Sequence, residues 1–447
     1  MKYKVAIIGG GPAGYTAAEA AGKAGLSVIL FEKKSMGGVC LNEGCIPTKT
    51  LLYSAKIYDN SKQGVKYGVT VPEASIDLGK VIARKSKVVR KLVLGVKAKL
   101  TSNNVTIVTG EAEILDKTHI KCNEEVIECE NMILCTGSET FIPPISGIDD
   151  TPYWTHCDAL DNKEIPASLI VIGGGVIGME FASFFNSLGT KVIVIEMLDE
   201  ILPGMDKEVS GMLREEYTKK GIKFLLTTRV SQVANGEDGT IVTYISNDST
   251  ETITTEKLLV STGRRPVTQG FGLENLSLEL TDRKCIHVNE CMESSVPGVY
   301  VCGDLNGFSL LAHTAVREAE VAVHHILGKE DKMSYRAIPG VVYTNPECAG
   351  VGETEETLQL KGISYRSIKL PMTYSGRFVA ENEGFNGMCK LLVSEDDVVL
   401  GVHLLGNPAS EIITIAGMAI ESCMKTEELK KIVFPHPTVA EILREVL

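Results

Sequence analysis

Two cysteines near the start of the chain have the spacing that most directly suggests chemistry. Cys40 and Cys45 lie in the stretch GGVCLNEGCIPTK, residues 37–49. Residues 46–54 are predicted to be helical, and a rise of ~1.5 Å per residue would separate two cysteines five apart in one helix by ~7.5 Å. The Cα atoms of a usual disulfide are only ~4.4–6.8 Å apart. We therefore expect Cys40 on a distorted first turn or in the loop before the helix.

Closely spaced cysteines at the start of a helix are typical of an exchangeable dithiol rather than of a structural disulfide. The alternative is two unrelated buried thiols, and the flanking Gly37, Gly38, Gly44 and Pro47 favour the dithiol.

A glycine-rich turn precedes these cysteines. Residues 4–8 are predicted to form a buried strand that runs into Gly9, Gly11 and Gly14, followed by an Ala-rich helix and a second strand ending at Glu32. This order of elements is typical of a dinucleotide-binding unit. The glycines allow backbone N–H groups to approach a pyrophosphate at the helix N-terminus, and the acid accepts hydrogen bonds from a ribose.

The same pattern returns later in the chain, after a strand predicted for residues 169–172. Gly173, Gly175, Gly178 and Glu196 each lie 164 residues after their counterparts. Two chance glycine turns would not be expected to share the distance to the acid. The sequence therefore predicts two dinucleotide sites in two separately folded domains.

Composition narrows the class of protein. The chain has 447 residues, 44% of them hydrophobic and 23% charged, with a net charge of −12, which argues against nucleic acid or anionic membrane as a partner. The basic stretch at residues 80–99 is predicted to be one amphipathic helix. The twelve cysteines include no C-x-x-C, so no metal site is expected. No apolar run is long enough to cross a bilayer, and a cytoplasmic location with reduced thiols is expected.

The remaining segments also end in recognisable residues. Strands predicted for residues 131–138 and 258–263 end in similar TGS and TGR turns, and residues 298–304, GVYVCGD, form a short strand ending at Asp304. From about residue 335 the alternation of strands and turns predicts an α+β domain with a mainly antiparallel sheet. That domain ends in His-Pro-Thr-x-x-Glu, residues 436–441.

The ordered set of motifs resembles the flavin-dependent pyridine-nucleotide disulfide reductases over nearly the whole chain. The matching pieces are the first glycine turn, GGVCLNEGCIPTK, GGGVIGME, TGRRP, VCGD, LLAHTA, VVYTNPE and HPTVAE. The resemblance implies an α/β protein with two Rossmann-like dinucleotide-binding domains, for FAD and NAD, plus a C-terminal α+β dimerisation domain. The implied limits are 1–140 completed by 265–334 for FAD, 141–264 for NAD and 335–447 for the homodimer interface.

The resemblance also implies functional residues, grouped by role. Those implied in catalysis are Cys40, Cys45, Lys49, Glu180, His436 and Glu441. Those implied in FAD binding are Gly9, Gly11, Pro12, Ala13, Gly14, Glu32, Lys49, Thr136, Gly137, Ser138, Asp304 and Ala312. Those implied in NAD binding are Gly173, Gly175, Ile177, Gly178, Glu196 and Gly263.

The implied roles suit the chemistry of each residue type. Cys45 would face the flavin and Cys40 would exchange with substrate, while His436 of the second subunit would take the substrate thiol's proton and Glu441 would orient it. Lys49 and Glu180 would form a pair near the flavin, although a surface salt bridge explains them about as well. Purely structural roles would also explain three of the other residues. His436 could be a surface histidine, Ile177 could serve helix packing, and Asp304 could be a helix N-cap.

The leading hypothesis is NAD-dependent oxidation of dihydrolipoamide carried by a lipoyl domain of a 2-oxoacid dehydrogenase complex or by a glycine-cleavage lipoyl protein. The alternative enzyme is an NADH-linked reductase of another disulfide or of a metal ion, as in glutathione or mercuric reductases. A flavoprotein redox sensor without turnover is a third hypothesis. Two departures from the family pattern, Phe434-Pro435 before the terminal histidine and Glu43 between the cysteines, bear on substrate choice.

Overall fold

The computed structural model describes residues 2–447, and these divide into two compact units. Unit 1 comprises residues 2–50, 83–141 and 264–334. Unit 2 comprises residues 51–82, 142–263 and 335–447. Two long helices, α3 (Cys45–Gln63) and α4 (Leu78–Ser102), have residues in both units. Helix α4 is the amphipathic helix predicted from the basic stretch.

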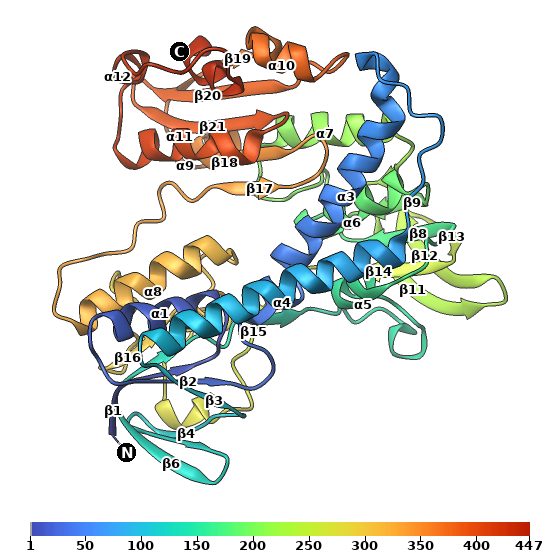
Figure 1. Cartoon of the computed structure of the whole chain (residues 1–447). Coiled ribbons are helices and arrows are strands. Elements are labelled where there is room, and N and C mark those ends of the chain that lie inside the picture. Colours follow the sequence, from blue (N-terminus) through green and yellow to red (C-terminus); the bar gives the residue numbers. More distant parts are fainter. Residues whose placement is uncertain (1) are drawn as a thin grey trace. The chain divides into compact units, whose positions relative to one another are not determined.

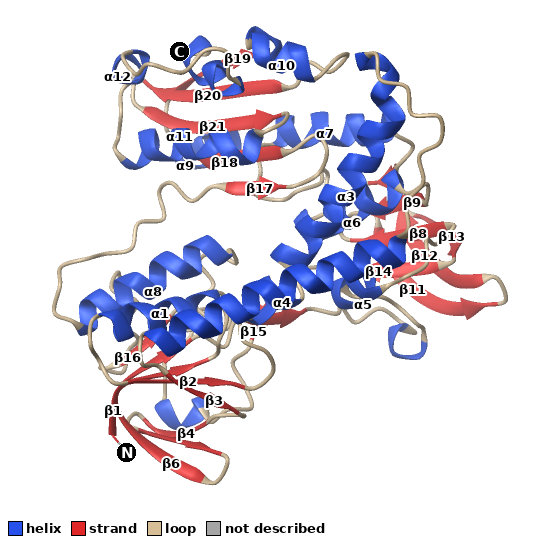
Figure 2. Cartoon of the chain, viewed as in Figure 1, coloured by secondary structure: helices blue, strands red, loops and turns tan. Residues whose placement is uncertain are grey.

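Unit 1 is built on a sheet whose strands follow the order β3-β2-β1-β6, with β16 also paired to β6 (Figures 1 and 2). These pairs are all parallel, and they place the carboxyl ends of β1, β6 and β16 beside one another. Strands β4 and β5 extend β6 as an antiparallel ribbon, and β7 pairs with β15 in a separate two-stranded sheet. The strands are β1 (Lys2–Ile8), β2 (Val28–Glu32), β3 (Thr106–Thr109), β4 (Glu113–Asp116), β5 (His119–Cys122), β6 (Glu125–Leu134), β7 (Ser138–Thr140), β15 (Arg264–Pro266) and β16 (Val299–Val301).

Helices α1 (Pro12–Lys23) and α8 (Ala312–Ile326) pack against each other in unit 1 (Figure 1). The buried face of α1 is made of small residues, so a second helix can approach closely. The other helical segments of unit 1 are α2 (Gly38–Asn42) and the short 3₁₀ turn η3 (Leu273–Leu276).

The first part of unit 2 repeats the strand–turn–helix–strand order of unit 1. Its parallel sheet has the order β10-β9-β8-β14, and a separate antiparallel sheet has the order β11-β12-β13. Its elements are α5 (His156–Asp161), β8 (Ser168–Ile172), α6 (Val176–Ser187), β9 (Lys191–Ile195), α7 (Lys207–Lys219), β10 (Lys223–Leu225), β11 (Arg229–Gly236), β12 (Gly239–Ser246), β13 (Ser249–Thr255), β14 (Lys257–Val260) and the 3₁₀ turns η1 (Gly64–Tyr67) and η2 (Ile148–Asp150).

The last part of unit 2 is a five-stranded antiparallel sheet with helix α11 packed on it (Figure 2). The strand order is β17-β18-β21-β20-β19. The elements are β17 (Gly340–Val342), β18 (Cys348–Gly352), α9 (Glu355–Lys361), β19 (Tyr365–Leu370), α10 (Gly376–Glu381), β20 (Met388–Ser394), β21 (Val399–Leu405), α11 (Ala409–Glu421), α12 (Thr426–Lys430), α13 (Ile442–Glu445) and the 3₁₀ turns η4 (Met372–Tyr374) and η5 (Val439–Glu441).

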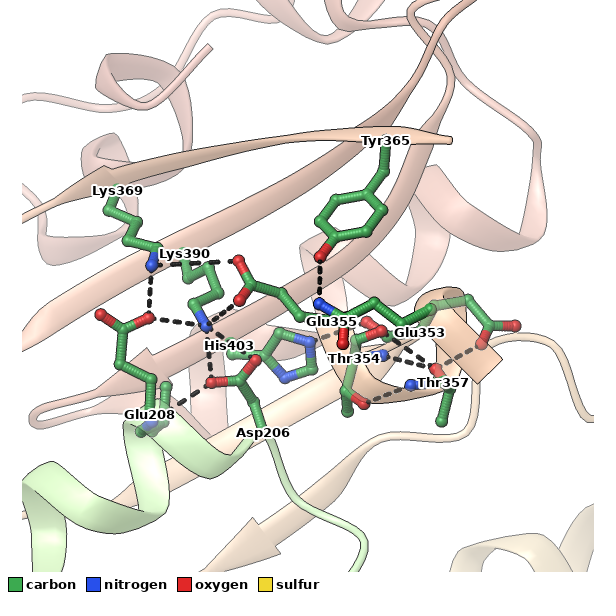
Figure 3. Close-up of polar contacts among 12 residues, drawn as sticks. Asp206, Glu208, Glu353, Thr354, Glu355, Thr357, Tyr365, Lys369, Lys390 and His403 are labelled. Carbon is green, nitrogen blue, oxygen red and sulfur yellow. Dashed lines mark hydrogen bonds and ion pairs between the residues drawn. The ribbon is translucent and has the colours of Figure 1, made fainter. Parts of the chain in front are cut away.

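A buried lysine joins this sheet to helix α7. Lys390 on β20 is 1% exposed and lies 2.8 Å from a carboxylate oxygen of Asp206, which is itself fully buried and caps the N-terminus of α7 (Figure 3). Its ammonium also lies 2.7 Å from Glu208 and 3.6 Å from Glu355. Three carboxylates around one buried ammonium compensate the cost of removing that charge from water.

The predicted fold class is confirmed by this architecture. Several predicted strands are shorter or shifted: the strand predicted for residues 131–138 begins at Glu125 and ends at Leu134, and the TGS turn lies outside it. Strand β18 was not predicted. No helix within residues 2–447 is both long and apolar enough to span a membrane.

Candidate active site

The predicted dithiol lies in unit 1, with its two cysteines on different helices. Cys40 lies in the five-residue helix α2, and Cys45 is the first residue of α3. Because the two helices are separate, Cys40 and Cys45 do not lie on one continuous helix, in which they would be too far apart to form a disulfide. The two side chains are hydrogen bonded to each other as thiols.

Helix α2 is held tightly against the first glycine turn. Gly37 and Gly38 adopt left-handed backbone conformations with φ of 100° and 57°. A Cβ added at Gly38 would lie 2.7 Å from the Cα of Gly11. Because only glycine allows this approach, the GG pair fixes the dithiol beside the glycine turn.

The environment disfavours ionisation of Cys40. The hydrogen bond to Cys45, then burial and the charge of that neighbour, raise the pKa of Cys40, and Lys49 opposes the rise. One thiol of the reduced pair therefore keeps its proton when the other ionises. Tyr15 on α1 also faces the pair: burial, followed by the two thiols, raises the pKa of its hydroxyl.

The first glycine turn has the geometry that a dinucleotide requires. A Cβ at Gly9 would lie 2.2 Å from the Cys135 carbonyl oxygen, and one at Gly14 would lie 1.8 Å from the Gly9 carbonyl oxygen. The carboxylate of Glu32 accepts hydrogen bonds of 2.7 Å from the backbone N–H groups of Gly10 and Lys34. No described side chain caps the N-terminus of α1, which begins at Pro12 and Ala13, so its first N–H groups are available to a phosphate.

The second glycine turn, in unit 2, repeats this geometry. The carboxylate of Glu196 accepts hydrogen bonds of 2.7 Å from the Gly174 N–H and 2.8 Å from the Leu198 N–H. A Cβ at Gly173 would lie 2.3 Å from a backbone oxygen, and one at Gly178 would lie 2.1 Å from another. In both turns the acid therefore holds the glycine loop through backbone N–H groups.

The remaining residues predicted for this second site lie nearby in the chain, and they are less distinctive. Gly175 is the N-cap of α6, and Gly263 is exposed with φ of 109°. Ile177 is half-buried and packs against the hydrophobic core of unit 2, which fits helix packing as well as nicotinamide contact.

A half-buried acid, Asp304, lies where the strands of unit 1 end. The Ser138 hydroxyl donates a 2.5 Å hydrogen bond to Asp304, and the guanidinium of Arg264 donates to Ser138 at 2.7 Å. Burial raises the pKa of Asp304, while Ser138 and Arg264 oppose the rise. Gly137 has φ of 70°, and the Thr136 hydroxyl donates to the Val267 carbonyl at 3.0 Å, so the TGS turn is held in place.

Two polar residues of this region were missed in the sequence analysis. Arg264 was noted only as part of a motif, although it holds the Ser138 side chain. Glu318 on α8 is fully buried and accepts a 2.6 Å hydrogen bond from the Gly303 N–H. An acid on the apolar face of a predicted helix was the available signal. Ala312, predicted to contact FAD, is the first residue of α8.

His436 and Glu441 meet near the end of the chain, in unit 2. The His436 ring lies 2.9 Å from one carboxylate oxygen of Glu441, and the other oxygen accepts a 2.7 Å hydrogen bond from the Thr438 N–H. The Thr438 N–H and the His436 ring lower the pKa of Glu441, so this carboxylate is charged at neutral pH. The His436 side chain is 79% exposed, so its ring is open to an incoming group.

The predicted Lys49–Glu180 pair is divided between the two units, with Lys49 in unit 1 and Glu180 in unit 2. Glu180 is 2% exposed and accepts a 3.1 Å hydrogen bond from the Tyr343 N–H. An acid buried this deeply is not part of a surface salt bridge.

Comparisons with known proteins cover nearly the whole chain. Residues 3–319 match the family model for pyridine nucleotide-disulphide oxidoreductases, and residues 338–447 match the dimerisation domain of the same family. Dihydrolipoyl dehydrogenase of Geobacillus stearothermophilus is 37% identical, over 98% of this chain and 94% of that protein. The enzyme of the same name from Thermus scotoductus is 38% identical, over 99% of this chain and 96% of that protein.

Two solved structures are also similar. LpdA from Mycobacterium tuberculosis superposes with a TM-score of 0.92 at 26% identity, covering 99% of this chain and 98% of that one. The HOCl-induced flavoprotein disulfide reductase RclA from Escherichia coli superposes with a TM-score of 0.88 at 28% identity, covering 99% of both chains.

Proposed function

Because the chain belongs to the pyridine nucleotide-disulphide oxidoreductase family, whose members use FAD and NAD(H), we propose that this enzyme oxidises protein-bound dihydrolipoamide with NAD⁺. The hydrogen-bonded Cys40–Cys45 dithiol beside the first glycine turn is the observation that carries the proposal. Full-length similarity to several dihydrolipoyl dehydrogenases supports the choice of substrate.

We assign one cofactor to each glycine turn. We assign FAD to the first turn of unit 1 with the TGS turn, Asp304 and the start of α8, and NAD to the second turn with Glu196. When bound, FAD supplies two-electron transfer between the dithiol and the nicotinamide. In the family the flavin lies between the dithiol and the nicotinamide. The protein's residues therefore have to hold the dithiol and the nicotinamide in place and to accept and donate protons. Lys49 and Glu180 are proposed to act beside the flavin.

Thiol exchange with the substrate is assigned to Cys40. A substrate thiolate attacks the Cys40 sulfur of the oxidised pair, and Cys45 leaves as a thiolate. The second substrate thiol then attacks the first substrate sulfur, which forms the cyclic disulfide and releases Cys40. His436 takes the protons that the substrate thiols lose, and the charged Glu441 carboxylate stabilises the ring while it holds them.

We propose that the base comes from a second copy of the chain. The match of residues 338–447 to a dimerisation domain supports a homodimer, and the exposed His436 side chain is free to face another subunit. The macromolecular substrate would be a lipoyl domain or lipoyl protein in the cytoplasm.

A coupled assay tests the proposed reaction. Purified holoenzyme with NAD⁺ and dihydrolipoamide should form NADH, and Cys40→Ser should abolish this activity. Cys291→Ser is the matched control, because Cys291 is also partly exposed in unit 1 and lies outside the site. Failure of the wild-type holoenzyme to form NADH would refute the substrate.

A second candidate is NADH-dependent reduction of another disulfide or of a metal ion. The likeness to RclA, a flavoprotein disulfide reductase also solved as a Cu(II) complex, favours it. Comparing kcat/KM for NADH oxidation with lipoamide, glutathione disulfide and Cu(II) separates the two. Preference for glutathione disulfide or Cu(II) over lipoamide would establish the second candidate.

A further inference from the structure

A second pair of cysteines lies at the carboxyl ends of two neighbouring parallel strands of unit 1. Strands β16 and β6 pair Val299 with Met132, and the register ends with Val301 opposite Leu134. Cys302 and Cys135 directly follow the ends of β16 and β6, and the Cys302 N–H donates a 3.0 Å hydrogen bond to the Leu134 carbonyl. The register therefore continues for one more residue and sets the two cysteines side by side.

The spacing of paired strands suits a disulfide. Neighbouring strands lie about 4.7–4.9 Å apart, within the ~4.4–6.8 Å that separates the Cα atoms of bonded cysteines. Side chains at the same level of adjacent parallel strands point to the same face of the sheet. The thiols of Cys135 and Cys302 are hydrogen bonded to each other, and both residues are buried, with exposed fractions of 7% and 0%.

These thiols lie beside the first glycine turn. A Cβ at Gly9 would clash with the Cys135 carbonyl oxygen. The N–H of Cys135 donates a 2.8 Å hydrogen bond to the Ile8 carbonyl. One residue beyond Cys302, the Gly303 N–H is held by the buried carboxylate of Glu318. The pair thus joins the two chain segments that lead into the TGS turn and Asp304.

We propose that Cys135 and Cys302 form a second redox-active pair, separate from Cys40–Cys45, which closes to an intrachain disulfide when the protein meets hydrogen peroxide. The proposal requires no movement of either strand, because the register already brings the sulfurs together. It also does not depend on the identity of the enzyme's substrate.

The reaction balances with peroxide as the two-electron oxidant. One thiol loses its proton, and its sulfur attacks a peroxide oxygen, which gives a sulfenic acid and one water. The second sulfur attacks the sulfenic sulfur, the disulfide forms, and the hydroxyl leaves with a proton as a second water. Overall two thiols and one hydrogen peroxide become one disulfide and two waters.

Burial of the Cys135–Cys302 pair determines how fast it is oxidised and which oxidants can reach it. Desolvation, then the hydrogen bond and charge of Cys135, raise the pKa of Cys302 well above its ordinary value, and the nearby Glu318 carboxylate acts in the same direction. A thiol that ionises rarely reacts slowly, so this pair should close more slowly than an exposed thiol such as Cys423 is oxidised. Peroxide is small enough to reach a buried site, whereas a bulky alkylating reagent is not.

The test is disulfide mapping on the FAD-loaded protein. A Cys40→Ser, Cys45→Ser background removes the other dithiol. This protein is treated with hydrogen peroxide, denatured with N-ethylmaleimide present, digested and analysed by mass spectrometry. We expect a peptide linking Cys135 to Cys302 that disappears on reduction, and a loss of two alkylatable thiols per chain from this pair.

Matched variants define the control. Cys135→Ala or Cys302→Ala in the same background should eliminate the linked peptide and leave the other cysteine alkylatable. Cys129, buried on the same strand β6, should remain a free thiol throughout. The proposal is overturned if Cys135 and Cys302 of the parent protein remain fully alkylatable at a peroxide dose that oxidises Cys423. It is equally overturned if they reach sulfinic acid without forming the linked peptide.

Discussion

At the scale of single residues, the positions of the two active-site cysteines suggest different tasks. Cys45 begins α3, four residues before Lys49, while Cys40 lies on the separate helix α2. A helix N-terminus and a nearby cation both favour a thiolate. We propose that Cys45 remains beside the flavin as a thiolate and that Cys40 exchanges with substrate.

Replacing the cysteines one at a time tests this order. Cys40→Ser should leave a Cys45 thiolate beside the oxidised flavin and produce a new long-wavelength absorbance band, whereas Cys45→Ser should not. The measurement is the visible spectrum of each FAD-loaded variant above pH 7, with Cys291→Ser as control. Identical spectra for the two variants would show that the assigned order is wrong.

The acid of the second glycine turn should set the choice of nicotinamide cofactor. A 2′-phosphate placed ~4 Å from the Glu196 carboxylate would meet repulsion of roughly 4 kcal/mol per unit charge at an effective dielectric of ~20. Since ~1.4 kcal/mol is tenfold, kcat/KM should be several hundred-fold higher with NADH than with NADPH. Comparable values with both cofactors would contradict the assignment of Glu196.

The sequence predicted that an acid follows the second strand of each glycine-turn unit, because the distance from the glycines to the acid is a local property. It did not predict that Glu32 and Glu196 also hold the turns through N–H groups two and twenty-two residues away. The contact from Arg264 to Ser138 depends on pairing between β15 and β7, strands 126 residues apart in the chain. Long-range pairing of that kind leaves no local pattern to read.

At the scale of elements, the ion cluster around Lys390 connects α7 to the C-terminal sheet (Figure 3). Glu208 also forms an ion pair of 2.6 Å with Lys369 on β19, so the cluster includes a second strand of that sheet. Sequence periodicity gave no indication of it, because a lysine in the middle of strand β20 is expected to point to solvent.

Removing the buried ammonium should be costly. Lys390→Met leaves the fully buried Asp206 carboxylate without its cation, and breaking such a pair costs about 3–5 kcal/mol. The urea midpoint of the holoenzyme should fall sharply. Lys219→Met, on the helix that Asp206 caps but in an exposed pair with Glu216, is the matched control and should change little. Equal midpoints for the two variants would contradict the role of the cluster.

The neighbouring His403 should make stability depend on pH. Burial lowers the pKa of His403, while the charge of Asp206 and the 2.8 Å hydrogen bond between its Nε2 and the Glu353 carbonyl oppose the fall. Its Nδ1 finds no partner among residues 2–447. As pH falls below the unfolded value of ~6.5, the unfolded chain binds a proton that the folded chain excludes, so stability is lost. Urea midpoints at pH 7.5 and 5.5 should differ more for wild type than for His403→Gln. An identical difference would refute this source of pH dependence.

Elements were predicted best where a turn signal or a motif bounded them. The turn residues of NGEDG, residues 235–239, predict a hairpin, and the structure has one there, with Gly236 opposite Gly239 at its end. Strand β18, CAGVG, was missed because a short run of small residues carries no clear alternation. Its place in the sheet comes from pairing with β17 and β21 on either side.

At the scale of the whole molecule, the central claim is that the dithiol of one subunit works with the base of another. If so, His436→Gln should lower dihydrolipoamide oxidation by about 10²–10⁴-fold, the usual contribution of a general base, while NADH still reduces an artificial dye. Cys40→Ser should also be inactive with dihydrolipoamide.

Mixing these two inactive proteins tests the claim most directly. After subunit exchange in equal amounts, half of the dimers should be hybrids with one intact site, which restores about a quarter of wild-type NAD⁺ reduction by dihydrolipoamide in a two-fold symmetric dimer. The exchange itself is verified with differently tagged subunits and native mass spectrometry. Activity should return as hybrids form. Verified hybrids without activity would contradict the shared site, because His436 would then not be supplied by the partner.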